Sequence, residues 1–158
     1  MKGIKIKNLA SRVKSIYQTD NPIEILDMRG VKVLPLELDD DMEYFEGAYI
    51  GNKDINIVVY NKNLKRDRKK LVLWHETGHN VAHRDHNINS ITKNISISSG
   101  KEELEADIFA AEAIIDDDTF LDYLKFYKYT DTQIACDLNI PVKYVRLKFE
   151  NFDKSKLL

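Results

Sequence analysis

One short run constrains the fold of this chain more than any other feature: residues 75–79, His-Glu-Thr-Gly-His, which follow an apolar stretch. Residues four apart on a helix lie one turn apart on the same face, so His75 and His79 can bind one metal ion with Glu76 beside it. The chain has four histidines in 158 residues. A chance match to the pattern somewhere in such a chain is on the order of one per cent or less. The run therefore predicts a helix that carries two metal ligands and a general base.

Length and composition favour one domain. The chain is 43% apolar with a net charge of −2, which is ordinary for a globular protein and gives no overall basic field for nucleic acid. At 158 residues it is long enough for one real core and short for two. We expect a single metallopeptidase domain over 1–158, with a zincin-like core over about 1–128 and a C-terminal helix pair over about 129–152.

Nothing in the sequence indicates export or a membrane segment. Residues 1–7 alternate lysines with apolar residues and lack the apolar core and cleavage site of a signal peptide. No stretch approaches the roughly twenty apolar residues that a membrane helix needs. Cys136 is the only cysteine, which excludes an internal disulfide and suits a reducing compartment. We therefore expect a cytoplasmic protein that does not enter a membrane.

Periodicity and turn residues predict an α+β fold. Three short apolar runs, at 31–36, 44–50 and 55–60, are typical of strands. We expect them to form a small antiparallel three-stranded sheet packed on a zincin-like helix pair. Residues 84–100 are polar and predict a loop, with one short strand near 95–97. Helices are expected over residues 9–17, 22–28, 71–83, 101–115, 119–128, 130–138 and 141–149.

A catalytic zinc site needs a third protein ligand and one open position for water. The metzincin pattern would place that ligand at Asp85, but it needs a glycine at position 82, where this chain has Ala82. His83 continues the row of the two histidines, yet three successive ligands on one straight helix cannot converge on a tetrahedral ion. His86 is a candidate by residue type alone. We keep His83 as a possible substrate-site residue.

The helix expected over 101–115 offers a better third ligand. At about 100° per residue, Glu103 and Asp107 lie roughly 40° apart on one face, among small and apolar residues. Glu105 lies about 200° from Glu103, on a charged face with Glu112. The first face suits a metal-binding carboxylate, Glu103, and a carboxylate that accepts the free ring N–H of a bound histidine, Asp107. The alternative is an ordinary amphipathic helix with acidic residues near its N-terminal end.

The strand expected at 55–60 is followed by a basic segment and then by the His-Glu-x-Gly-His helix, with a further histidine four residues on. The segment Glu-Leu-Glu-Ala-Asp-Ile-Phe-Ala-Ala begins at residue 103. Together these four features resemble the ImmA/IrrE family of zinc metallopeptidases. The resemblance covers about residues 20–150. It implies that Glu103, which opens the family's Glu-x-x-Ala-(Asn/Asp)-x-Phe-Ala segment, is the third ligand. Thr77 and residues 114–116 depart from the family pattern, but neither is a proposed ligand.

The chemistry and the resemblance imply a zinc endopeptidase of the HExxH type. Zn²⁺ bound by His75, His79 and Glu103 would activate a water molecule and polarise the scissile carbonyl. Glu76 would take the proton of the water and pass it to the leaving amine. Compact family members from phages and integrative elements cleave the helix-turn-helix repressor that silences the element, so the resemblance implies a repressor as the protein substrate and an anti-repressor role. A broad-specificity peptidase is disfavoured, because the chain shows no secretion signal or propeptide.

The end of the chain supports a different hypothesis. Residues 130–146 combine a polar cap, an Ile-Ala pair, a tight turn and a basic second helix, a pattern similar to a helix-turn-helix. The second hypothesis is a non-catalytic zinc-containing regulator that binds DNA or a protein partner through these helices. Glu76 discriminates between the two, because a purely structural zinc site needs no general base. For hydrolysis, His83, Tyr144 and Arg146 are candidate donors to the oxyanion.

Overall fold

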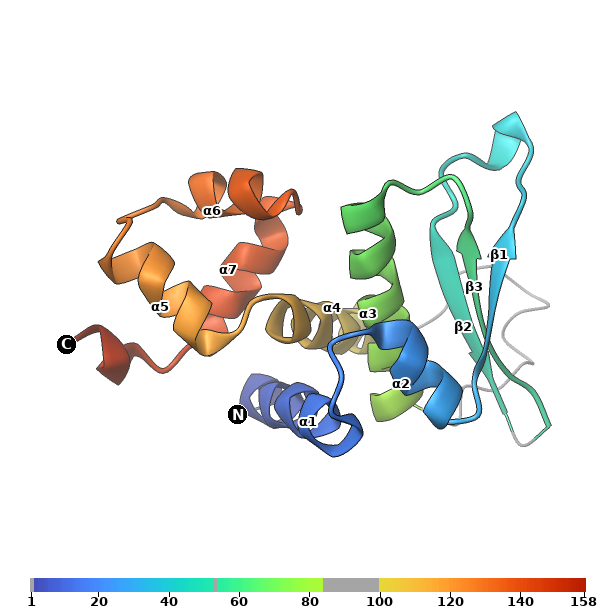
Figure 1. The fold of residues 1–158 in the computed structure, drawn as a ribbon, viewed down its shortest axis with the longest axis horizontal. Coiled ribbons are helices and arrows are strands. Elements are labelled where there is room, and N and C mark those ends of the chain that lie inside the picture. The colour runs from blue at the N-terminus through green and yellow to red at the C-terminus, as the bar shows by residue number, and fades with distance from the viewer. Residues whose placement is uncertain (1, 53, 84–99) are drawn as a thin grey trace.

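The computed structural model describes residues 2–52, 54–83 and 100–158. In this part of the chain, α-helices precede and follow the strands of a small sheet along the sequence. In space, the C-terminal helices form a lobe on the side away from the sheet (Figure 1). The predicted strand near 95–97, Asp85 and His86 lie outside the described residues. The elements are α1 (Lys2–Tyr17), α2 (Pro22–Met28), β1 (Lys32–Leu36), η1 (Asp40–Met42), β2 (Gly47–Gly51), β3 (Asn56–Asn61), α3 (Arg66–Ala82), α4 (Gly100–Ile114), α5 (Asp117–Lys125), α6 (Asp131–Leu138), α7 (Val142–Asn151) and η3 (Lys154–Leu157).

The sheet is mixed, so the prediction of an antiparallel sheet is wrong for one strand. β3 lies in the middle and pairs antiparallel with β2, with Gly47 opposite Tyr60. On its other side β3 pairs parallel with β1, with Lys32 opposite Ile57. In the sequence, β2 lies between β1 and β3 and belongs to the crossover that a parallel pair requires. Pro35 is tolerated in β1 because that strand lies at an edge, where a missing N–H costs no ladder bond.

The helix α3 separates two hydrophobic clusters. Trp74 is fully buried and its ring lies 6.2 Å from that of Phe109 of α4, in the larger cluster, which also includes residues of α1 and of the C-terminal helices. Leu73 points the other way, into a smaller cluster with Leu26 of α2 and Val58 of β3. Apolar side chains on two faces explain why α3 is buried over most of residues 71–80. The helix that carries the histidines is therefore held rigidly between both cores.

The buried ion pair between α4 and α7 was not expected from the sequence. We predicted Glu112 on a charged face, but it is 7% exposed. Lys148 of α7 is 1% exposed, and its Nζ donates to Glu112 Oε2 and to Asp117 Oδ1, both at 2.6 Å. α7 covers this face of α4, so the charge of Glu112 is compensated within the core instead of by water. This contact fastens the C-terminal helices to the helix that carries Glu103.

The helix boundaries largely follow the predicted ranges. Asn21 caps α2 by accepting from the Ile23 N–H at 3.0 Å, and Thr130 forms a capping box with Gln133 at the start of α6. α6 and α7 are joined by a short turn in which Asn139 adopts a left-handed conformation with φ 52°. α1 begins at Lys2, earlier than the predicted start at residue 9.

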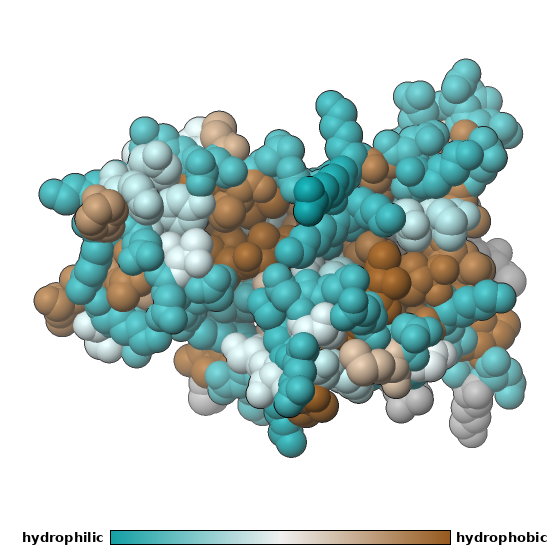
Figure 2. Space-filling view, in the orientation of Figure 1, coloured by the Kyte–Doolittle hydropathy of each residue, from teal (hydrophilic) through white to brown (hydrophobic). Residues whose placement is uncertain are grey.

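The face of the molecule seen in Figure 1 is mostly hydrophilic (Figure 2). Apolar residues reach this surface over the C-terminal helices and near the sheet, among charged neighbours. Among the described residues, no helix is long and apolar enough to cross a membrane.

Candidate metal centre

α3 presents its two histidines to α4. Their side chains are 16% and 7% exposed, for His75 and His79 respectively, and the ring centroids lie 4.9 Å apart. The spacing of four residues places both rings on one face, as the sequence predicts. Thr77, between them in the sequence, is buried on another face, where its hydroxyl donates to the Leu73 carbonyl at 2.7 Å. The departure from the family pattern at Thr77 therefore does not affect the histidine face.

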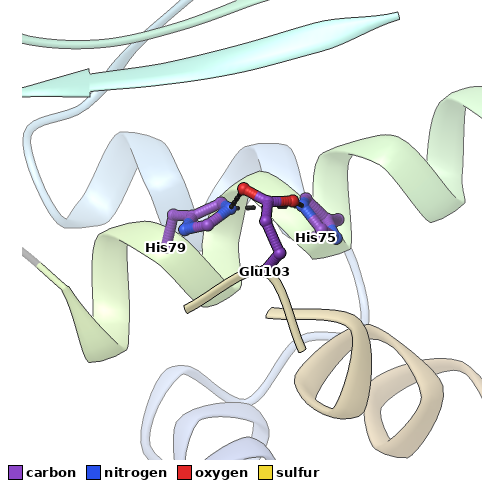
Figure 3. A group of neighbouring side chains, drawn as sticks. All are labelled: His75, His79 and Glu103. Carbon is purple, nitrogen blue, oxygen red and sulfur yellow. Dashed lines mark hydrogen bonds and ion pairs between the residues drawn. The ribbon is translucent and has the colours of Figure 1, made fainter. Parts of the chain in front are cut away.

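Glu103 of α4 completes a group of three side chains with the histidines (Figure 3). Its Oε2 lies 3.2 Å from His75 Nε2, and its Oε1 lies 3.2 Å from His79 Nε2. The two Nε2 atoms also lie 3.2 Å from each other. Among the described residues this is the only group of three or more potential ligands that could hold a metal ion.

The distances fit a tetrahedral metal ion. Ligands that bind zinc at about 2.0–2.1 Å with tetrahedral angles lie roughly 3.3 Å from one another. The two Nε2 atoms are 3.2 Å apart, close to that value, and each lies 3.2 Å from a different oxygen of Glu103, so the three groups can converge on one ion. Two imidazole nitrogens and one carboxylate are also a donor set of catalytic metal sites. The Glu103 side chain is 44% exposed, so the group is open to solvent on that side, where water or a substrate can approach.

The carboxylates and the imidazole rings of the group shift the pKa values of one another. Burial disfavours the charged form of His75, but hydrogen bonds to Asp107 and Glu103 outweigh burial and raise the pKa of His75 to about 10. The hydrogen bonds from His75 and His79 hold the pKa of Glu103 well below its usual range. Both shifts come from the contacts between the carboxylates and the imidazole rings.

Asp107 lies behind His75, one helical turn after Glu103. Its Oδ1 is 3.0 Å from His75 Nδ1, so the ring can donate to the carboxylate with Nε2 left free as a ligand. This is the contact that the helix-face argument predicted. Two further groups contact Asp107: the Tyr144 hydroxyl donates to Oδ1 at 2.8 Å and Lys143 Nζ to Oδ2 at 3.0 Å. Sequence reasoning missed both contacts, because no local pattern links α7 to α4.

Glu76 lies between α3 and the edge strand β2. It is 6% exposed, and burial raises its pKa although the charges of the neighbouring histidines oppose this. A Cβ built on Gly47 would lie 2.6 Å from Val72 Cγ1 and 3.5 Å from Glu76 Oε1, so the glycine lets β2 approach this side of α3 closely. Glu76 is thus a buried carboxylate with a raised pKa next to the histidines, which suits a general base.

Two other candidates from the sequence do not belong to the group of three. His83 follows the end of α3; its ring lies 6.0 Å from that of His79, and its Nε2 is 3.2 Å from Glu105 Oε2. The Arg146 side chain bonds to Asp131 at 2.7 Å, on the surface. The structure therefore brings Arg146 to neither the histidines nor Glu103, and His83 stays a prediction as a substrate-site residue.

Gly78 controls how closely α3 and α4 approach. A Cβ at this position would lie 3.1 Å from Phe109 Cβ and 3.2 Å from Ala106 Cα, so Gly78→Ala must move the helices apart by a few tenths of an ångström. Because a misplacement of 1 Å can cost about 10²-fold in function, we expect a loss of roughly threefold to tenfold in metal affinity. Competition with a chromophoric chelator measures it.

Gly100→Ala is the matched control for Gly78→Ala. Among the residues that the structure describes, nothing lies within 4 Å of a Cβ at Gly100. We expect this variant to bind metal as the wild type does. Equal affinities for both variants would contradict the role of Gly78 in helix approach.

Comparisons with known proteins identify the family of this chain. Residues 26–150 match the family model described as the IrrE N-terminal-like domain. The chain is 29% identical over 143 residues to the uncharacterized immunity region protein 2 of Bacillus phage phi105, an alignment covering 90% of this chain and 88% of that protein. It is also 29% identical over 143 residues to the metallopeptidase ImmA of Bacillus subtilis strain 168, covering 89% and 80%. The chain therefore belongs to the ImmA/IrrE family of metallopeptidases.

Proposed function

We propose that this protein is a zinc-dependent, site-specific endopeptidase that hydrolyses a peptide bond in a protein partner, a helix-turn-helix repressor of a phage or mobile element. The observation that carries the proposal is the group of His75, His79 and Glu103, with donor atoms 3.2 Å apart and the buried Glu76 on the same helix turn. Two histidines and a glutamate are the donor set of several zinc peptidases, which favours zinc as the ion.

Each side chain has a defined task in this proposal. His75, His79 and Glu103 would hold the ion, and Asp107 would keep the His75 ring oriented. Bound zinc would lower the pKa of the attacking water and, as a Lewis acid, would polarise the scissile carbonyl. Glu76 would take a proton from the attacking water and give it to the leaving amine. Its burial supports this task, because burial raises the pKa of the carboxyl and makes the carboxylate a stronger base than an exposed glutamate.

The residues of α7 favour the peptidase over a regulator that reads DNA. Lys148 and Tyr144 are buried. The two more exposed basic residues, Lys143 and Arg146, form ion pairs with Asp107 and Asp131. These contacts direct the basic groups of α7 to the protein itself, whereas a recognition helix presents them to phosphates and bases.

A repressor is proposed as the substrate from the family and from its relatives. One relative is named as an immunity region protein of a phage and another as the metallopeptidase ImmA. The chain covers 88% and 80% of these proteins, so it matches most of their length. A repressor meets its peptidase in the cytoplasm, and we propose that location for this protein.

The proposal is tested by incubating the purified protein with the repressor encoded beside it. We expect cleavage at one main bond, identified by mass spectrometry, and little cleavage of casein. A chelator should abolish the reaction, and added zinc should restore it. An intact repressor after incubation with the zinc-loaded protein would refute the proposed substrate, and cleavage of casein at many bonds would refute the site specificity.

A further inference from the structure

The carboxylate of Asp107 is fixed from two helices. From α3, the His75 ring approaches Oδ1 through Nδ1 at 3.0 Å. From α7, the Tyr144 hydroxyl donates to the same oxygen at 2.8 Å, and Lys143 Nζ donates to Oδ2 at 3.0 Å. A hydroxyl and a ring nitrogen thus converge on one oxygen atom. The position of that oxygen decides how the His75 ring is turned.

The two donors from α7 are not equivalent. Tyr144 is 5% exposed, so its side chain is shielded from solvent. The Lys143 side chain is 57% exposed, so its ion pair with Asp107 is screened by solvent and its flexible stem holds the carboxylate loosely. Burial and the charge of Asp107 raise the pKa of Tyr144, so the hydroxyl keeps its proton and remains a donor. Tyr144 is therefore the rigid support of Asp107.

We propose that Tyr144 is a positioning residue of the metal centre: its hydroxyl holds Asp107 where the carboxylate accepts the His75 ring N–H, and so raises the affinity of the site for the ion. This inference rests on the proposed function only in taking zinc as the bound ion. It also gives the C-terminal helix pair a task, because α7 supports a metal ligand that lies on α3. The buried pair of Lys148 with Glu112 holds α7 against α4 and keeps Tyr144 in register with Asp107.

The alternative is that the hydroxyl of Tyr144 only stabilises the fold. Tyr123 allows the two possibilities to be separated. It is 8% exposed, close to the 5% of Tyr144, and its hydroxyl also donates to an aspartate, Asp137. Tyr123 lies in α5 and its partner in α6, and neither contacts the three candidate ligands. Tyr123→Phe is therefore a matched control that removes a tyrosine–aspartate hydrogen bond away from the site.

The test measures the zinc affinity of Tyr144→Phe by competition with a chromophoric chelator, and the visible spectrum of the cobalt-substituted protein. Replacing partners that orient a metal ligand directly costs about 10–100-fold in affinity. Tyr144 acts one contact further away, so we expect a loss of roughly threefold to tenfold and an altered cobalt spectrum. Tyr123→Phe should leave both unchanged. Zinc binding is measured without a substrate, so a failure to cleave the repressor counts against the proposed function alone.

A double-mutant cycle with Asp107→Ala tests whether Tyr144 acts through Asp107. If it does, Tyr144→Phe has no further effect on zinc affinity when Asp107 is already alanine. The same loss in both backgrounds would overturn the proposal. So would an affinity within twofold of the wild type together with an unchanged cobalt spectrum. A lower unfolding midpoint of metal-free Tyr144→Phe, with unchanged metal binding, would assign the hydroxyl to the fold and also overturn it.

Discussion

Replacing Glu76 with glutamine is expected to slow cleavage strongly and to keep the metal. The amide has nearly the same shape and fits beside His75 and His79, but it cannot accept the proton of the attacking water. General acid–base catalysis contributes about 10²–10⁴-fold to rates, so we expect a loss of that size in kcat/KM. Cleavage of the repressor is followed by gel electrophoresis, and bound zinc is measured by atomic emission on the same sample.

Glu150→Gln serves as the control for Glu76→Gln. Glu150 lies on the exposed side of α7, so its replacement removes the same charge from the protein without a change near the histidines. We expect this variant to cleave and bind zinc as the wild type does. If Glu76→Gln cleaved at the wild-type rate, Glu76 would not be the general base. If Glu76→Gln also lost its zinc, the loss of activity would result from the missing metal ion and not from a missing proton transfer.

Replacing Glu103 with alanine is expected to lower zinc affinity by more than about 100-fold, beyond the 10–100-fold loss that follows replacement of partners outside the ligand shell. The carboxylate contacts both histidines at 3.2 Å and is the only acidic member of the group. Two neutral imidazoles alone would leave the charge of the ion uncompensated and one coordination position unfilled. Competition with a chromophoric chelator measures the affinity, and cleavage should be lost in parallel.

Glu105→Ala is the matched comparison for Glu103→Ala, because Glu105 lies two residues away on the same helix. It also contacts a histidine, His83, at 3.2 Å, so both variants remove one charge and one carboxylate–imidazole contact. We expect zinc affinity to change by less than about threefold for Glu105→Ala, because its carboxylate contacts His83 and is not one of the three candidate ligands. The reverse ranking of the two variants would exclude Glu103 as the third ligand.

The assignment of Glu103 could be made from the sequence because helix geometry is local. A rotation of about 100° per residue places Glu103 and Asp107 on one face without any knowledge of the rest of the fold. The structure shows that face turned toward the histidines of α3. The same reasoning failed for Glu112, which we expected on a charged face. That face is covered by α7, and the partner of Glu112, Lys148, lies 36 residues further along the chain.

The strand segments were also predictable, but their arrangement was not. The apolar runs at 31–36 and 55–60 correspond closely to β1 and β3. Their parallel pairing depends on how the chain crosses between them, and alternation within a strand carries no information about the order of strands. The sequence therefore indicated strands, whereas contacts between distant segments determined the sheet.

By itself, the sequence determined the identity and spacing of the candidate ligands and the candidate base. These are two histidines and a base on one helix turn, and two carboxylates on one face of another helix. These relations depend on helix periodicity, which operates over four residues. Only the tertiary structure decided which groups from other helices these side chains contact. The packing of α3 against α4 sets the 3.2 Å separations, and α7 brings Tyr144 to Asp107. Such contacts depend on long-range packing, which no pattern of neighbouring residues specifies.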